Sequence, residues 1–190
     1  MGKKEKEVTL VERTLILIKP DGMEKRLTGT VLAAFEKQGL KLVGIKMVKA
    51  RNKLLSQHYP DSMAATLGEK TKASYLNKGK EFPRDPTQFG MKVLKKLRKF
   101  VGSAPVIAMV LEGENAIAKV RSIIGGTEPV TAGEGTIRQT YSDDSYEKAD
   151  SENRAIKNIV HASGNVEEAM NEIRIWFKEK ELFGYQQKTY

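Results

Sequence analysis

The sequence contains no cysteine and only two histidines, His58 and His161, among its 190 residues. Disulfides, thiol catalysis and cysteine-ligated zinc are therefore excluded, and a metal site built from several histidines is nearly so. The phosphate-binding signatures G-x-x-x-x-G-K-[ST] and G-x-G-x-x-G are also missing, so any phosphate groups would need a cradle of side chains. Phosphate chemistry with a histidine as the nucleophile is therefore the leading hypothesis.

Long apolar runs are missing as well. No run approaches the ~20 residues that span a bilayer, and Met1–Glu7 is charged with no apolar segment behind it. We therefore expect no membrane span and no secretory signal, and the lack of cysteine agrees with the cytoplasmic location that we expect. Because 190 residues suit one domain with a substantial core, we expect a single domain over residues 1–190, with a basic extension at residues 1–12.

The chain is basic, with a net charge of +9 and a pI near 9.6. Such a charge can attract nucleic acid, anionic lipid or small polyanions. Several cations crowd one helix-like stretch: Lys92, Lys95, Lys96, Arg98 and Lys99. Aromatic residues of the kind that stack RNA bases are not interleaved with them, so a solvated basic face is favoured. A basic nucleic-acid-binding module is the alternative hypothesis, and the diffuse charge is its only support.

Apolar periodicity and breaker residues predict an α+β domain. The expected strands are Arg13–Lys19, Leu40–Ala50, Pro105–Leu111 and Ile156–Ala162. The expected helices are Leu27–Gln38, Asn52–His58, Phe89–Phe100, Ala116–Ile124 and one from Val166 to Phe177, with Asn52 and Asn165 as caps. Asp61–Gln88 mixes glycine, proline and charge, which indicates partial helix at best. This order matches a ferredoxin-like split βαβ layout, a four-stranded antiparallel sheet with helices packed on one face.

His161 lies where the last expected strand hands over to the last helix. Taken alone, a histidine in an apolar strand is more often a core residue than a catalyst. The other motifs of the sequence change that interpretation. Lys19-Pro20-Asp21-Gly22 ends the first strand, Gly135-Thr136-Ile137-Arg138 lies in a glycine-rich loop, and Arg121 and Thr127 flank a Gly-Gly pair. Guanidinium groups pair bidentately with phosphoryl oxygens, so these residues are suited to hold a phosphate near one nucleophile.

Four motifs in order resemble those of the nucleoside diphosphate kinase family. They are Ile18-Lys19-Pro20-Asp21-Gly22, His58-Tyr59, Gly135-Thr136-Ile137-Arg138 and Asn158-Ile159-Val160-His161-Ala162-Ser163. Each motif alone is weak, but the four in this order are specific. The resemblance runs from Arg13 to about Tyr185, and two stretches, residues 60–87 and 139–157, are insertions relative to the family's short members.

The resemblance implies ping-pong transfer of a phosphoryl group from a nucleoside triphosphate to a nucleoside diphosphate. His161 would carry the phosphate, and Glu172 would orient the imidazole directly or with Ser163. The implied nucleotide-binding residues are Lys19, Tyr59, Arg121, Thr127, Arg138 and Asn158. No protein ligand to a metal is expected, because Mg²⁺ would arrive on the nucleotide's phosphates. The family also implies a homo-hexamer or homo-tetramer, and weak contact with the base implies that many bases are accepted.

Two positions depart from the family's pattern. Gly164 stands where the family commonly has aspartate after His-x-Ser, and Asn165 is expected to supply the helix cap instead. The aromatic residue that clamps the base has no certain equivalent here, since Phe89 and the non-aromatic Val93 both suit the spacing. His58 is interpreted as structural.

Overall fold

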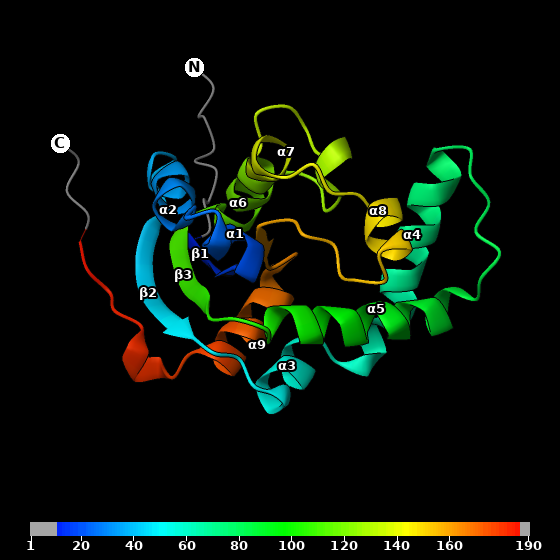
Figure 1. Cartoon of the computed structure of the whole chain (residues 1–190). Coiled ribbons are helices and arrows are strands. Elements are labelled where there is room, and N and C mark those ends of the chain that lie inside the picture. Colours follow the sequence, from blue (N-terminus) through cyan, green and yellow to red (C-terminus); the bar gives the residue numbers. More distant parts are fainter. Residues whose placement is uncertain (1–10, 187–190) are drawn as a thin grey trace, which may run out of the picture.

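The computed structural model describes residues 11–186 (Figure 1). Of the basic extension predicted at residues 1–12, residues 1–10 lie outside the described part of the chain. Val11 and Glu12 belong to the first strand, so the sheet begins slightly before the predicted start at Arg13. Within residues 11–186, no helix is long and apolar enough to cross a membrane.

The four strands form one antiparallel sheet, which confirms the predicted ferredoxin-like fold. They are β1 (Val11–Ile18), β2 (Lys41–Val48), β3 (Val106–Glu114) and β4 (Val160–Ala162), in the order β2-β3-β1-β4. β1 pairs antiparallel with β3 and β4, and β2 pairs antiparallel with β3. β4 is shorter than the predicted Ile156–Ala162, because Ile159 has a φ of 68° and interrupts the extended backbone.

Nine α-helices surround the sheet in the described residues. They are α1 (Pro20–Glu24), α2 (Thr28–Glu36), α3 (Asn52–His58), α4 (Ala64–Asn77), α5 (Pro86–Val101), α6 (Ala116–Ile124), α7 (Ile137–Tyr141), α8 (Tyr146–Ser151) and α9 (Val166–Trp176). Short 3₁₀ turns cover Asp61–Met63, Pro129–Thr131 and Glu179–Glu181. α6 has the predicted bounds. The predicted cap of α3 is wrong, because Arg51 is the N-cap residue and no side chain caps this helix.

Helices cover both faces of the sheet, whereas the sequence pattern predicted one face. Ile16 and Ile18 belong to the core that holds α2 and α6, and Leu15 and Leu17 belong to the core that holds α3, α5 and α9. Leu15 to Ile18 are all fully buried. A strand that is apolar on every residue requires a cover on each face, since successive side chains point to opposite sides.

α4 and α5 form a helical hairpin, which corrects the expectation of partial helix over Asp61–Gln88. α4 is 14 residues long, but it buries few apolar side chains, so its apolar periodicity is weak. The two helices touch through glycines: a Cβ at Gly68 would overlap the backbone of Pro86, and a Cβ at Gly90 would overlap the backbone of Ala64. α5 begins with Pro86 at its first turn and with the Asp85 carboxylate accepting a hydrogen bond from a backbone N–H.

Candidate active site

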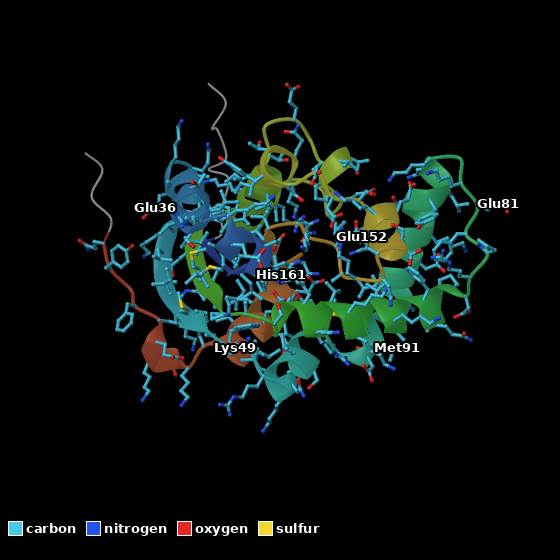
Figure 2. The ribbon with its side chains drawn as sticks, viewed as in Figure 1. Glu36, Lys49, Glu81, Met91, Glu152 and His161 are labelled. Carbon is cyan, nitrogen blue, oxygen red and sulfur yellow. The ribbon has the colours of Figure 1, made fainter. Side chains whose placement is uncertain are left out.

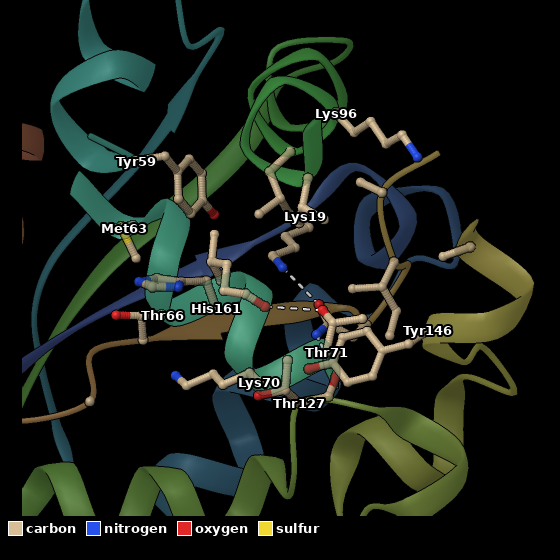
Figure 3. Close-up of a pocket in the computed structure, with 18 of the residues that line it drawn as sticks. Lys19, Tyr59, Met63, Thr66, Lys70, Thr71, Lys96, Thr127, Tyr146 and His161 are labelled. Atoms are coloured by element: carbon tan, nitrogen blue, oxygen red, sulfur yellow. Dashed lines mark hydrogen bonds between the residues drawn. The ribbon is translucent and has the colours of Figure 1, made fainter. Parts of the chain in front are cut away.

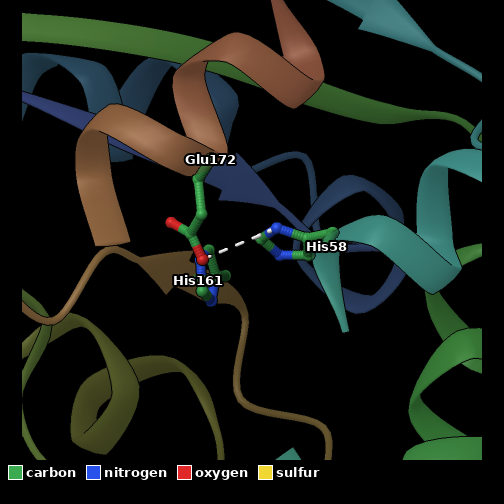
Figure 4. Close-up of side chains that lie close together, drawn as sticks. All are labelled: His58, His161 and Glu172. Carbon is green, nitrogen blue, oxygen red and sulfur yellow. Dashed lines mark hydrogen bonds and ion pairs between the residues drawn. The ribbon is translucent and has the colours of Figure 1, made fainter. Parts of the chain in front are cut away.

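The imidazole of His161 contacts a carboxylate from the last helix. His161 lies on β4 opposite Leu17 of β1, near the middle of the molecule (Figure 2). Its Nε2 is 3.0 Å from Oε1 of Glu172 on α9 (Figure 4). Oγ of Ser163 donates to Oε2 of the same carboxylate at 2.6 Å. Because an ionised carboxylate only accepts hydrogen bonds, Nε2 carries the proton and Nδ1 keeps its lone pair.

Glu172 is ionised although it is buried. Burial by itself would raise the pKa of this carboxyl group, but the imidazoles of His161 and His58 and the hydroxyl of Ser163 bring the pKa down to about 2. A permanent negative charge therefore faces Nε2 of His161 throughout the neutral pH range. Such a charge holds one tautomer of the imidazole and stabilises positive charge on the ring.

A strained residue immediately precedes β4. Ile159 is β-branched and has a φ of 68°, a conformation that such residues rarely adopt. Two contacts from the Lys19-Pro20-Asp21-Gly22 segment hold it: the N–H of Ile159 donates to Oδ2 of Asp21 at 2.8 Å, and the N–H of Lys19 donates to the carbonyl of Ile159 at 2.8 Å. Asp21 therefore positions the segment that carries His161. The motif containing Asp21 was visible in the sequence, but its role was not predicted.

A cavity of 460 Å³ opens in front of His161 (Figure 3). All of the predicted nucleotide-binding residues line it, together with His161: Lys19, Tyr59, Arg121, Thr127, Arg138 and Asn158. Glu172 and Ser163 do not line the cavity and lie behind the imidazole. Residues separated by more than a hundred positions in the sequence thus meet around one space, whose walls carry mostly positive charge.

Lys19, Asn158 and Thr127 form one hydrogen-bonded chain. Nζ of Lys19 donates to Oδ1 of Asn158 at 2.7 Å, and Nδ2 of Asn158 donates to the carbonyl of Thr127 at 2.7 Å. Burial, with a further contribution from Arg138, lowers the pKa of Lys19 to about 8. The ammonium group is therefore charged at neutral pH although burial opposes that charge, which suits it to an anionic ligand.

Arg138 is fixed by the backbone. Nη1 donates to the carbonyl of Gly125 at 2.9 Å and Nη2 donates to the carbonyl of Val160 at 2.8 Å, next to His161. Burial lowers the pKa of Arg138 to about 10, and nearby Arg121 contributes. The sequence suggested a flexible loop end at this position, whereas Arg138 lies in α7 with its guanidinium held in one orientation.

His58 and Tyr59 pack against the imidazole of His161. The ring of His58 is edge-on to that of His161, with centroids 4.6 Å apart, and its Nδ1 is 3.5 Å from Oε1 of Glu172. Burial, helped by His161, lowers the pKa of His58 to about 3, so this ring is neutral. The hydroxyl of Tyr59 is buried and has no hydrogen-bond partner within residues 11–186, and burial raises its pKa. His58 was interpreted as structural, and in the described residues its buried, neutral ring packs beside Glu172 without a hydrogen bond to it.

His58, His161 and Glu172 are the one group of potential metal ligands that the described residues bring together, with donor atoms within 4.8 Å of one another. Two imidazoles and one carboxylate oxygen do not suit Mg²⁺, which prefers several oxygen ligands and water. The carboxylate oxygen also already accepts a hydrogen bond from Nε2 of His161. The cationic walls of the cavity instead favour a divalent ion that arrives on an anionic ligand.

Asn165 caps α9 as predicted. Its Oδ1 accepts from the N–H of Glu168 at 2.8 Å, and Oε2 of Glu168 accepts from the N–H of Gly164 at 2.8 Å. A Cβ at Gly164 would lie 2.6 Å from Oε2 of Glu168, which is the end of a flexible side chain. Gly164 therefore leaves room for the Glu168 carboxylate to accept a hydrogen bond from the backbone. This carboxylate lies directly after the His-x-Ser segment, where the family commonly has an aspartate.

The cavity has further walls that the sequence did not reveal. Its lining includes Lys70 and Thr71 of α4, Lys96 of α5 and Tyr146 of α8. α4 and α8 lie in the two stretches predicted as insertions, where no recognisable motif marks these residues. Both candidates for the base clamp, the aromatic Phe89 and the non-aromatic Val93, also line the cavity, so the geometry does not choose between them.

The fold and the site together define a phosphotransferase: an oriented histidine faces a cationic cavity on a ferredoxin-like sheet. The family model described as nucleoside diphosphate kinase matches residues 12–77 and 87–182. The chain belongs to the nucleoside diphosphate kinase family. The match omits residues 78–86, within the first predicted insertion, and runs through the second. Enzymes of this family act on nucleoside di- and triphosphates and need a divalent cation.

Several relatives resemble the chain over nearly their whole length. The nucleoside diphosphate kinase of Pyrobaculum aerophilum is 41% identical in an alignment 180 residues long that covers 90% of this chain and 98% of the relative. That of Carboxydothermus hydrogenoformans is 37% identical, over 93% of this chain and 94% of the relative. Among solved structures, an NDP kinase from Pyrobaculum aerophilum has a TM-score of 0.85 at 38% identity, covering 92% of this chain and all of that one.

A second solved structure has a ligand. It is described as a transition-state mimic of the nucleoside diphosphate kinase from Borrelia burgdorferi, with bound vanadate and ADP. Its TM-score is 0.79 at 34% identity, and the alignment covers 94% of each chain.

Proposed function

We propose that this nucleoside diphosphate kinase transfers the γ-phosphate of a nucleoside triphosphate through a phosphohistidine on Nδ1 of His161. In the first half-reaction, the Nδ1 lone pair attacks the γ-phosphorus, the bond to the β–γ bridging oxygen breaks, and a nucleoside diphosphate leaves. In the second, a terminal β-phosphate oxygen of another diphosphate attacks the phosphohistidine and frees the imidazole. The observation that carries the proposal is the 3.0 Å contact of Nε2 with Glu172, which leaves Nδ1 as the nucleophile.

The surrounding residues have distinct proposed roles. Glu172 holds the Nε2 proton and stabilises the ring as it becomes positively charged, and Ser163 holds Glu172 in place. Arg121, Arg138 and Thr127 bind phosphate oxygens, so that negative charge on the transferring group meets fixed donors. Tyr59 contacts the phosphoryl group or the imidazole, and Lys19 and Asn158 contact the sugar hydroxyl and the phosphate. The lining of one cavity by all of the nucleotide-binding candidates supports these roles.

The divalent ion is proposed to be Mg²⁺ that enters with the nucleotide. When bound, it neutralises phosphate charge and orients the phosphate oxygens. The proposal assigns it no protein ligand, which agrees with the basic lining of the cavity. Nucleotides of several bases are expected as substrates.

Assembly, organisation and location are further parts of the proposal. By family resemblance, the chain forms a homo-hexamer or a homo-tetramer and acts in the cytoplasm. It is proposed as a single kinase domain with insertions at residues 60–87 and 139–157. A basic nucleic-acid-binding module, the alternative considered from charge alone, has no specific observation in its favour.

Brief exposure to γ-labelled ATP tests the proposed intermediate. The wild-type protein should retain a label that is labile to acid and stable to base, and His161→Ala should retain none. His58→Ala, which removes the other imidazole, should still become labelled. An acid-labile phosphoprotein in the His161→Ala variant would show that the nucleophile is a different residue.

A further inference from the structure

The turn between α4 and α5 is joined by ion pairs to the opposite wall of the cavity. Three cations at residues 78–84 pair with three acids at residues 128–150: Lys78 with Glu128 at 2.7 Å, Lys80 with Glu147, and Arg84 with Asp150. Figure 2 places Glu81 of this turn at the outer end of the molecule, away from His161. The turn lies in residues 78–86, which the family match omits, whereas the three acids lie in the matched part of the chain.

Glu128 is the buried member of this set. Its side chain is 5% exposed, whereas Glu147 and Asp150 are more exposed. Its carboxylate accepts from Nζ of Lys78 at 2.7 Å, from Oγ of Ser74 at 2.9 Å and from the N–H of Tyr146 at 2.9 Å. Buried hydrogen bonds to a charge resist solvent screening, while exposed ion pairs contribute little. Of the three acids, Glu128 therefore contributes most to the link between the turn and the cavity wall.

Glu128 connects segments that form three walls of the nucleotide cavity. Thr127, its neighbour in the chain, lines the cavity and is bonded through its carbonyl to Asn158. Tyr146, at the start of α8, lines the cavity beside Thr127 (Figure 3). Ser74 lies one helical turn beyond the lining residues Lys70 and Thr71 of α4. One carboxylate thus ties α4, α8 and the phosphate-binding loop to one another.

We propose that Glu128 is a positioning residue for nucleotide binding. It holds Thr127 and the α4 wall in their binding arrangement before the nucleotide arrives, so that the nucleotide does not have to order them. Without this link, part of the binding free energy would be consumed in ordering the walls, and affinity would fall. The inference rests on the proposed function, because it takes the cavity in front of His161 as the nucleotide site.

The effect should fall more on binding than on the chemical step. Glu128 has no hydrogen bond to His161, Ser163 or Glu172 in the described part of the chain. Loss of one hydrogen bond to a charged group corresponds to about tenfold in an equilibrium constant. We therefore expect Glu128→Ala to raise the Kd of ADP by about tenfold, and Lys78→Met to raise it in the same direction. Glu128→Gln retains an oxygen that accepts hydrogen bonds and should have an intermediate effect.

Two measurements on the full-length chain test this. Calorimetric titration with ADP gives Kd, and rapid quenching at saturating γ-labelled ATP gives the rate of phosphohistidine formation, which should stay within about threefold of wild type. Lys72→Met is the matched control, because Lys72 lies on the same helix in an exposed pair with Glu69 and should leave both values unchanged. If Glu128→Ala does not fold, Lys78→Met still tests the link, since it leaves the buried carboxylate with its other donors.

An unchanged Kd in Lys78→Met and in whichever Glu128 variant folds would overturn the inference, even if thermal stability fell. Slower phosphohistidine formation in these variants with an unchanged Kd of ADP would also overturn it. These outcomes are distinct from failure of the proposed function, in which the wild-type protein itself would form no phosphohistidine on His161.

Discussion

Replacing Glu172 with glutamine tests the carboxylate on which the orientation of His161 depends. The amide can still accept from Nε2 of His161, and its NH₂ group can donate to Oγ of Ser163, so the shape of the site is preserved. The negative charge is lost, and with it the group that stabilises positive charge on the imidazole during phosphorylation. The variant therefore separates charge from position.

The expected loss follows from the hydrogen bond itself. A hydrogen bond to a charged group contributes about 1.5–3 kcal/mol, which corresponds to a factor of roughly 10–100 in rate. Glu172→Gln should slow phosphohistidine formation by this factor, while the Kd of ADP should change little because Glu172 does not line the cavity. Glu172→Ala also leaves Ser163 and His161 without their partner and should be slower, by about 10²–10³.

Rapid quenching at saturating γ-labelled ATP measures the rate directly. Since the pKa of Glu172 is lowered to about 2, its ionisation should not contribute a limb to the pH–rate profile above about pH 4. Ser163→Ala is a useful comparison, because it removes one donor to the carboxylate and keeps the charge. A Glu172→Gln rate within threefold of wild type would refute the view that the charge of Glu172 assists the reaction.

Four further predictions concern binding and stability. Arg138→Ala should lower turnover by about 10²–10³, the scale for one fixed electrostatic partner. A change below threefold in both kcat and KM would show that Arg138 does not stabilise the transferring phosphate. Asn165→Ala should lower the free energy of unfolding by about 0.5–2 kcal/mol through loss of the α9 cap, seen as a lower Tm, while phosphohistidine still forms. Gly68→Ala should destabilise by about 1–3 kcal/mol because its methyl group overlaps the backbone of α5, and Gly29→Ala, which meets no atom within 4 Å, should not. Finally, the pKa of His58 falls from 6.5 to about 3 on folding, so the unfolded chain binds more protons between these values. Stability should therefore drop as pH falls through that window, by up to about 1.4 kcal/mol per pH unit. In urea unfolding, His58→Leu should show a smaller slope between about pH 4 and 7, and an unchanged slope would contradict the assignment.

The sheet and part of the site could be predicted from local sequence. A continuous apolar run stopped by Pro20 marks a buried strand, and Gly125 marks the end of α6, because these signals act on neighbouring residues. The cap at Asn165 is also a local contact, between residues three apart. The nucleotide-binding candidates were found through the order of the family's motifs, and their convergence on one cavity required the fold.

Other features depended on the tertiary structure. α4 has a weak apolar pattern, and it is stabilised as a helix by its close packing on α5, in which Gly68 of α4 lies against Pro86 and Gly90 of α5 lies against Ala64. The positive φ of Ile159 is imposed by hydrogen bonds to Asp21 and Lys19, more than a hundred residues away. Local propensity disfavours that conformation, so no sequence pattern could predict it.

The sequence by itself therefore determined which residues were available for phosphate chemistry, and it determined the strands and caps that depend on near neighbours. The tertiary structure decided which of those residues act together. It set Glu172 beneath His161, left His58 neutral beside them and joined Glu128 to Ser74 and Lys78 across the cavity wall. The physical reason is that burial and long-range hydrogen bonds control charge and orientation, and neither exists until distant segments pack together.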